Sequence, residues 1–523
     1  MRRVLLLLVA LGAAVTVVVA PARSPGPVGD EYLGVSSSVI ACPELAVTED
    51  SAAVLSGLVA VDRAVGASAP EPSRDDGSGA AALRRIDGET DLARIPAAGQ
   101  PVNLLAATRS IAPILLMAGG SWAPTAMAGV ATREIDGVGS GIASTTCVVP
   151  GPQWWFVGSG SQLGRGAALL VSNPAQEPAR FDITLYAPSG PVEALAGKGI
   201  DLGPQQGVRL RLDALAEDQA LLAVRVQATS GRVAAALRDV AVPEDDQPRG
   251  VDFIPPSIAP ANRLWIGTVP GDAVEQTLVL VNPGSQFATV QPRLLTTSGP
   301  AQPAGLGPIT VPARSVVSTP LASTIPDDGA TVELTSDLPV TGAVQSAWGT
   351  DPREVSWLSA TPAIEDPNTL AGAVAVPAGK GIEVSVSVTA PEGAVSGVLT
   401  VSGTGRARDS IFSETGELAD RVRDERSASR DVDVVTSESI ALATIAVDVP
   451  AGQVRTISIP EAARSSILHL VWRNADGSGP AIVSHLALDR DVPLATGYSW
   501  WPTLSAVTGV RVREDVGVLA PAD

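Results

Sequence analysis

The sequence LLVSNP at residues 169–174 has a copy, LVLVNP, 109 residues later at residues 278–283. Each copy is an apolar run that stops at Asn-Pro. This pattern predicts a buried strand ended by a turn, because proline cannot donate to a strand ladder and asparagine favours turns. The same spacing aligns the tripeptide SGP at 189–191 with SGP at 298–300, and Phe156 with Trp265. The sequence therefore predicts a true duplication.

The residues around these copies alternate between apolar and polar. Residues 181–186, 208–212 and 222–226 all follow a period of two, which is typical of half-buried strands. After the loss of one residue, Gly203-Pro204 aligns with Val311-Pro312. About seven short strands in about 110 residues match the size and spacing of an immunoglobulin-like β-sandwich.

A third, diverged unit follows the duplicated pair. Residues 383–388 alternate in the same way, and the sequence VPAG at 449–452 takes the place of VPAR at 311–314. Between these two segments, residues 403–439 form an insertion rich in both acidic and basic residues. Such an insertion is expected to be a solvated loop or a short surface helix.

The N-terminal region is less regular. The sequence PTAMAGV at 124–130 resembles the closing strand of the other units, which suggests an irregular fourth β unit. Residues 66–100 are rich in Ser, Pro, Gly and charge, and we expect them to form a mobile loop.

The predicted fold class is all-β, with tandem immunoglobulin-like β-sandwich units after an N-terminal signal or anchor segment. The predicted divisions of the chain are a signal or anchor at 1–22, an irregular β domain with a disulfide and a mobile loop at 30–150, repeat 1 at 151–258, repeat 2 at 259–365, and a diverged repeat 3 at 370–505 that carries the insertion 403–439.

The first 22 residues have the features of an export signal. Arg2 and Arg3 precede the apolar stretch 4–20, and Ala20-Pro21-Ala22 offers a small-x-small cleavage pattern. The apolar stretch also reaches the lower limit of a membrane span, about 17–25 residues. Cleavage and retention as an anchor both stay open. Either outcome places the rest of the chain outside the cytoplasm.

The chain has two cysteines, Cys42 and Cys147. In an exported protein we favour a disulfide over two buried thiols. The bridge would close a loop of about 105 residues, which the chain-entropy model values at roughly 4–5 kcal/mol.

The net charge of −19 argues against a nucleic-acid partner and against anionic lipid headgroups, because both need a basic face. Lysine occurs only at Lys198 and Lys380 in a chain rich in Ala, Val and Gly. That usage is typical of a high-GC genome and suggests an actinobacterial origin.

Little in the sequence points to catalysis. His469 and His485 are the only histidines, and both fall in predicted strands of the last unit, where they could face each other across one sheet. A metal site would need more ligands, and the glycine-rich segments at 137–141 and 158–161 match neither G-x-S-x-G nor a Walker A loop. We therefore predict no catalytic, cofactor-binding or metal-binding residue, and no cofactor.

Two tryptophan pairs, Trp154-Trp155 and Trp500-Trp501, are the candidate ligand or interdomain residues. Side chains alternate across a strand, so one ring of each pair should face the core and the other should face outward or into a domain junction. An exposed ring could stack on a sugar. Packing between units is the favoured alternative.

The sequence resembles an uncharacterised actinobacterial family of secreted or membrane-anchored β-sandwich proteins. The resemblance rests on Ser37-Ser38 before Ala41-Cys42-Pro43, on Cys147, on WWFVG at 154–158 and on Leu-x-x-x-Asn-Pro, and it spans roughly residues 30–490. It implies an extracytoplasmic, β-rich protein and assigns no catalytic residue.

The leading functional hypothesis is a non-enzymatic cell-envelope protein, a stalk of sandwiches that acts as a spacer or interaction scaffold for an envelope protein or a cell-wall glycan. The second is a carbohydrate- or cell-wall-binding module that uses Trp154 or Trp501. The third, an envelope hydrolase, is the least favoured because it would need one of the two histidines as its base.

Overall fold

A computed structural model describes residues 31–45, 51–61, 79–106, 112–134, 140–240, 250–303, 305–321, 324–349, 353–367, 369–405, 410–412, 433–435, 440–460, 462, 465–490, 494–503 and 506–509. The predicted signal or anchor at 1–22 lies outside these residues. Within them, no helix has both the length and the apolar character needed to cross a bilayer. The chain is all-β, as predicted, and its sheets are antiparallel.

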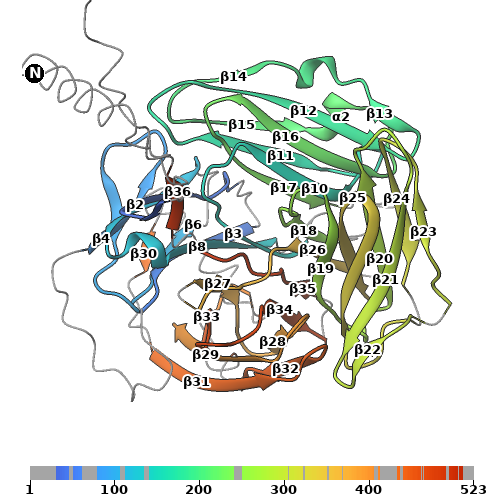
Figure 1. The fold of residues 1–523 in the computed structure, drawn as a ribbon. Coiled ribbons are helices and arrows are strands. Elements are labelled where there is room, and N and C mark those ends of the chain that lie inside the picture. The colour runs from blue at the N-terminus through green and yellow to red at the C-terminus, as the bar shows by residue number, and fades with distance from the viewer. Residues whose placement is uncertain are drawn as a thin grey trace, which may run out of the picture. The chain divides into compact units, whose positions relative to one another are not determined.

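The chain divides into two compact units, Val35–Ser505 and a smaller one made from both chain ends. In the smaller unit, β1 (Glu31–Gly34) pairs antiparallel with β36 (Ala506–Gly509). Among the described residues, the unit Val35–Ser505 contains four β-sandwiches, which we call the N-terminal sandwich, repeat 1, repeat 2 and the C-terminal sandwich (Figure 1). Three of them are pairs of separate sheets, and in repeat 2 the two layers are joined through one strand.

The N-terminal sandwich packs a four-stranded sheet, in the order β2-β7-β4-β5, against a five-stranded sheet, in the order β30-β6-β3-β8-β9. Leu83 and Leu116 from the first sheet share a core with Leu55 and Val130 from the second. The strands are β2 (Ser37–Ala41), β3 (Ser51–Val59), β4 (Gly79–Arg85), β5 (Asp91–Arg94), β6 (Val102–Ala106), β7 (Ile114–Gly120), β8 (Ala126–Glu134), β9 (Gly141–Thr146) and β30 (Asp433–Val435), with a short 3-10 helix η1 (Ala123–Thr125).

Repeat 1 packs a sheet of β10-β16-β12 with β13 and β14 against the sheet β15-β11-β17-β18. Its core holds Phe156, Phe181 and Leu169. The elements are β10 (Gln153–Ser159), β11 (Ala168–Asn173), β12 (Ala179–Ala187), β13 (Gly190–Val192), η2 (Leu195–Gly197), β14 (Ile200–Leu202), β15 (Gln206–Arg211), α2 (Leu212–Leu215), β16 (Leu222–Ser230), β17 (Ala234–Val240) and β18 (Val251–Ile254).

Repeat 2 differs from repeat 1 in one long strand, β25 (Ala330–Trp348), which takes part in both of its sheets. In repeat 1 this stretch is split into β16 and β17. The other strands are β19 (Ala261–Val269), β20 (Glu275–Asn282), β21 (Ala288–Thr296), β22 (Gly299–Ala301), β23 (Ile309–Val311), β24 (Ser315–Pro320) and β26 (Glu354–Thr361).

The C-terminal sandwich packs the sheet β27-β33-β29-β31 against the sheet β32-β28-β34-β35. Trp472 and Phe412 lie in its core and are fully buried. The strands are β27 (Leu370–Pro377), β28 (Ile382–Thr389), β29 (Val395–Thr404), β31 (Ile440–Val449), β32 (Val454–Ser458), β33 (Ile467–Asn474), β34 (Ile482–Asp489) and β35 (Leu494–Thr496).

The repeated Asn-Pro motif has the same structural role in both copies. Asn173 and Asn282 are fully buried at the ends of β11 and β20. Each side-chain amide donates to three main-chain carbonyls, and each Oδ1 accepts the main-chain N–H two residues further on. The accepting carbonyls are those of Glu177, Leu202 and Gly203 in repeat 1, and of Gln286, Val311 and Pro312 in repeat 2.

These bonds correct the predicted alignment. Leu202 and Gly203 take the places of Val311 and Pro312, so the spacing of 109 residues continues and no residue is lost. The backbone agrees, because Gln205 and Arg314, also 109 apart, both have a φ of 53°. Near the Gly158 bulge the sequence alignment is off by one. The ring of Trp265 lies against the guanidinium of Arg263, as the ring of Trp155 lies against that of Arg225, so Trp265 corresponds to Trp155 and not to Phe156.

Two predicted loops are partly wrong. Residues 79–100 of the expected mobile loop include β4 and β5, because Leu83 and Ile95 are apolar anchors in the N-terminal core. In the expected solvated insertion 403–439, Thr404 and Phe412 are buried, and β30 pairs with β6 of the N-terminal sandwich. That pairing gives the edge of β6 the partner an exposed strand edge requires.

The four sandwiches do not form a linear stalk. β9 contacts β18, β18 contacts β26, β26 contacts β35, and β35 contacts β9. One strand from each sandwich therefore meets at what we call the central junction. β27 of the C-terminal sandwich also packs on β8 of the N-terminal one. The chain therefore closes on itself, which the expected stalk did not foresee.

Replacing either repeated asparagine should destabilise the protein. Asn173→Ala and Asn282→Ala each leave buried carbonyls without a donor, and each is expected to cost about 1–3 kcal/mol of unfolding free energy. Urea unfolding followed by far-UV circular dichroism measures this loss.

Asn262→Ala is the matched control. Asn262 is exposed and donates one bond, to the carbonyl of Ser336, so its loss should change the free energy by no more than about 0.5 kcal/mol. Equal effects of all three substitutions would contradict a special role for the repeated asparagines.

Candidate functional site

Trp154 and Trp501 line one cavity of about 360 Å³, although 347 positions separate them in the sequence. The walls come from the N-terminal sandwich, from the start of repeat 1, and from the segments that flank β27 and follow β35. The lining residues are Ser38, Ile40, Ala123, Pro124, Ala126, Met127, Ala128, Thr146, Cys147, Val148, Val149, Trp154, Pro362, Gly372, Trp501, Pro502 and Thr503. A volume near 360 Å³ lies in the range of small-molecule pockets, about 300–1,000 Å³.

Trp154 is held firmly at one side of the cavity. Its Nε1 donates to the carbonyl of Val233 at 2.7 Å, and its side chain is 9% exposed. The main chains of Gly151 and Val233 bond to each other just before it, so the start of β10 is fixed to the start of β17. The indole therefore offers the cavity a rigid apolar surface whose polar atom is already satisfied.

Trp501 is half-buried and is held by the residues on both sides of it. Trp500 is fully buried; its Nε1 donates to Nδ1 of His485 at 2.9 Å, and its carbonyl accepts from Oγ1 of Thr361. On the other side, the N–H of Thr503 donates to the carbonyl of Leu370 at 2.7 Å. The position of Trp501 thus depends on contacts with repeat 2 and with β27.

The disulfide lies beside this cavity. Cys42 and Cys147 are bonded, as predicted, and Cys147 is one of the lining residues. The bond joins the end of β2 to the end of β9, and so fixes the wall that carries Ile40 and Val148.

The four predicted tryptophans therefore have different surroundings. Trp154 and Trp501 share the cavity. Trp155 packs between Tyr186, whose ring centroid is 5.8 Å away, and the guanidinium of Arg225 at 5.4 Å. Trp500 belongs to the core of the C-terminal sandwich.

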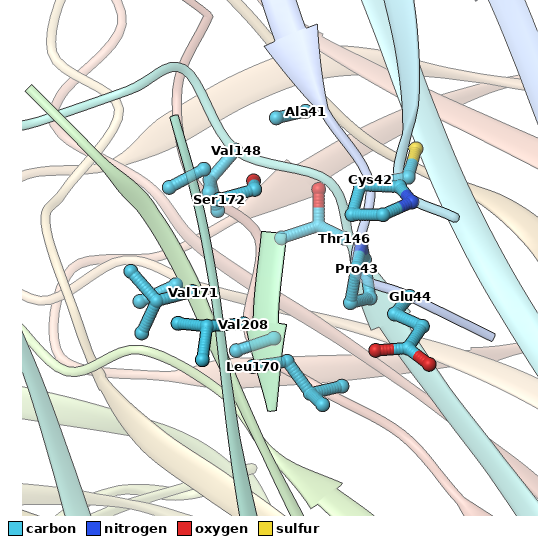
Figure 2. A pocket seen from close by; sticks show the side chains of 14 residues that line it. Ala41, Cys42, Pro43, Glu44, Thr146, Val148, Leu170, Val171, Ser172 and Val208 are labelled. Atoms are coloured by element: carbon cyan, nitrogen blue, oxygen red, sulfur yellow. The ribbon is translucent and has the colours of Figure 1, made fainter. Parts of the chain in front are cut away.

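A second hollow beside the disulfide is too small for a ligand. It follows the seam between the N-terminal sandwich and repeat 1, where Leu170 and Val208 lie opposite Cys42 and Pro43 (Figure 2). Its free volume is about 10 Å³, room for at most one water molecule. This seam is a packed interface.

The histidines are placed differently from the prediction. His469 lies in β33 and His485 in β34, which belong to different sheets, so the two rings do not face each other across one sheet. Both are buried, and burial lowers the pKa of each to about 3. Near neutral pH both are uncharged and shielded from solvent, which makes either of them a poor base for an external substrate. Among the described residues, no group of His, Cys, Asp and Glu is placed to hold a metal ion.

Asp252 is the first of two buried carboxyl groups at the central junction. It lies in β18 and is fully buried. Its Oδ1 accepts from Oγ1 of Thr496 in β35 at 2.9 Å and from the N–H of Ser144 in β9 at 3.3 Å, and its Oδ2 accepts from the N–H of Trp357 in β26 at 3.2 Å. One side chain thus links all four sandwiches.

Glu354, at the start of β26, has a similar role. Its Oε1 accepts from the N–H of Val251 at 2.9 Å, and its Oε2 accepts from the N–H of Ile142 at 3.2 Å. Gly141 and Gly250 lie against this carboxylate, and a Cβ at Gly141 would come within 2.2 Å of Oε2. The glycines therefore allow two backbones to approach the same side chain.

Burial raises the pKa of both carboxyl groups well above their usual range, and for Glu354 the nearby Asp252 raises it further. Sequence reasoning missed both residues. The available signal was an acid within an otherwise apolar strand, as in VDFI at 251–254.

Repeat 2 carries a separate cluster of charged residues on the outer face of β19, β21 and β25. Arg263 and Arg293 both bind the buried carboxylate of Glu333, and Arg263 also pairs with Glu392. The adjoining open groove of about 360 Å³ is lined mainly by polar and charged residue types. Because both guanidinium groups already have carboxylate partners, this network is structural.

Comparison with known proteins gives a family and little else. Residues 106–421 match a family described as "Family of unknown function (DUF5719)". No curated protein matches the sequence. One solved structure, trypsin-activated α2-macroglobulin from Escherichia coli, is 9% identical over 90% of this chain, and the match spans 42% of that protein's own chain. Its TM-score is 0.10, so it carries no argument about this fold.

The central carboxyl groups should make the protein less stable as the pH rises. A carboxyl group whose pKa is raised by folding contributes stability below its unfolded pKa, about 4, and loses that contribution as the pH rises through the folded pKa. Asp252→Asn and Glu354→Gln are permanently neutral. Their urea midpoints should therefore fall less than those of the parent protein between pH 5 and pH 8.

Asp201→Asn is the control, because Asp201 is a surface residue outside the junction. It should keep the pH dependence of the parent protein. The quantity compared is the change in urea midpoint with pH. A loss of stability that is the same at every pH does not change this slope. Parallel slopes for all four proteins would show that the junction carboxyl groups are ionised throughout this pH range.

Proposed function

This chain belongs to the DUF5719 family of unknown function, and from that starting point we propose that it is a non-enzymatic, extracytoplasmic scaffold of the cell envelope that binds a ligand or partner through the cavity between Trp154 and Trp501. The observation that carries the proposal is the cavity itself. Two tryptophans from distant parts of the chain line it, and a disulfide lies in its wall.

The extracytoplasmic location is supported by two independent features. The Cys42–Cys147 disulfide is typical of an oxidising compartment. The sequence Met1-Arg2-Arg3 followed by an apolar stretch is typical of an export signal. The lysine-poor composition is typical of a high-GC genome and favours an actinobacterial origin. In this form of the proposal the chain is secreted or anchored in the envelope, with its immunoglobulin-like units outside the membrane.

A scaffold accounts for the fold better than a spacer does. A spacer gains length from units joined end to end, whereas here β35 returns to β9 and β27 packs on β8. The fold therefore holds surfaces from four sandwiches in fixed positions around shared contacts. Such an arrangement suits the presentation of one site built from several parts of the chain.

The absence of enzymatic activity is proposed because the residues most able to supply acid–base chemistry are committed elsewhere. Both histidines are buried and have a pKa lowered to about 3. The buried carboxyl groups of Asp252 and Glu354 accept main-chain N–H groups and have no access to solvent. These groups are used to hold strands together.

A carbohydrate- or cell-wall-binding module is the second candidate. The half-buried ring of Trp501 beside Trp154 favours it, because aromatic faces offer a flat apolar surface to a sugar ring. This candidate uses the same cavity and differs in the class of ligand.

Binding should depend on Trp501. In equilibrium binding measurements with glycan arrays, peptidoglycan fragments and extracted envelope lipids, the purified chain should retain at least one ligand class, and Trp501→Ala should weaken that binding roughly tenfold or more.

Trp265→Ala is the matched control, since Trp265 is also a half-buried tryptophan but lies outside the cavity. It should bind as the parent protein does. Binding of none of these classes, or equal binding by both variants, would reject the cavity as the functional site.

A further inference from the structure

Among the residues that the structure describes, the cavity wall has no charged side chain. None of these lining residues is Asp, Glu, Lys, Arg or His. A charged group entering it would lose its water shell and find no opposite charge in the wall. The part of the ligand that fills the cavity is therefore uncharged.

Most polar side-chain groups of the wall already have partners. Nε1 of Trp154 donates to Val233, Oγ1 of Thr146 donates to the carbonyl of Cys147 at 3.2 Å, and Oγ1 of Thr503 accepts the N–H of Leu370 at 3.3 Å. A sugar would give up several hydrogen bonds to water and recover few of them here, which lowers affinity. An aliphatic chain has no such bonds to lose.

The walls are also fixed in advance. Trp154 is bonded at its indole nitrogen, and the disulfide and the contacts of Thr503 hold the neighbouring segments. Gly372 brings the backbone of β27 close to Met127, and a Cβ there would lie 2.9 Å from its sulfur. A preformed apolar cavity binds an apolar group without first having to close around it.

The sequence places this cavity within reach of a membrane. Ser38 follows the apolar stretch 4–20 by 18 residues, a chain length that spans at most roughly 60–65 Å when fully extended. When that stretch is kept as an anchor, the length of the chain limits how far Ser38 can lie from the membrane. Neutral membrane lipids are then the nearest source of aliphatic chains.

We propose that the cavity binds the aliphatic chain of an uncharged membrane lipid, held between Trp154 and Trp501. This inference rests on the proposed binding function and specifies its ligand class. It also agrees with the net charge of −19, which disfavours anionic headgroups.

The test uses the purified full chain and the uncharged fluorophore N-phenyl-1-naphthylamine, whose emission rises when it enters an apolar site. Dioctanoylglycerol, an uncharged lipid, should displace it, whereas chitohexaose should not. Trp501→Ala should weaken fluorophore binding roughly tenfold or more, and Trp265→Ala should leave it unchanged. Ser38→Phe, which places a large ring at the cavity wall, should also reduce binding, and it gives a second reading if Trp501→Ala fails to fold.

The possible outcomes distinguish a failure of the lipid assignment from a failure of the proposed binding function. Displacement by chitohexaose but not by dioctanoylglycerol would overturn the lipid assignment and leave the cavity as a binding site for a glycan. Binding of neither the fluorophore nor any of these ligands would overturn both. Unchanged binding by Trp501→Ala and Ser38→Phe, with both variants folded, would place the lipid site elsewhere and refute the inference.

Discussion

The fold depends on how four strand edges are satisfied where the sandwiches meet. β9, β18 and β35 are edge strands, and the first residues of β26 pair only with β25. Their outer N–H groups are buried, where a lost hydrogen bond is costly. Asp252 and Glu354 accept several of these groups, so two side chains provide what a continuous sheet would otherwise provide.

This solution brings two carboxyl groups together, and no ion pair with either of them is found among the described residues. Burial raises the pKa of both. This arrangement also makes the junction specific. The hydroxyl group of Thr496 donates to Asp252 and accepts the N–H of Ser144, and Gly141 leaves room for the carboxylate of Glu354. The cavity lies beyond the disulfide at the end of β9, so its shape depends on the same strand that the junction fixes.

Local patterns in the sequence predicted many of the strands, although not β4, β5 or β30. Alternation at 181–186 and 383–388 corresponds to β12 and β28, and the Asn-Pro motif marks the ends of β11 and β20. Contacts between distant segments could not be found in this way. Glu354 bonds to Ile142 across 212 positions, and β30 pairs with β6 from within a charged insertion. The tryptophans of the cavity were predicted as members of two adjacent pairs, but nothing in their local sequence shows that Trp154 and Trp501 line one cavity.

The closure of the chain limits how this architecture can vary. A linear array of repeats can gain or lose a unit because each unit contacts only its neighbours, and the ends accept a new cap. Here the last sandwich packs on the first, so an added or deleted copy would leave two mismatched faces and would separate the partners of Asp252. The number of units is therefore part of the fold.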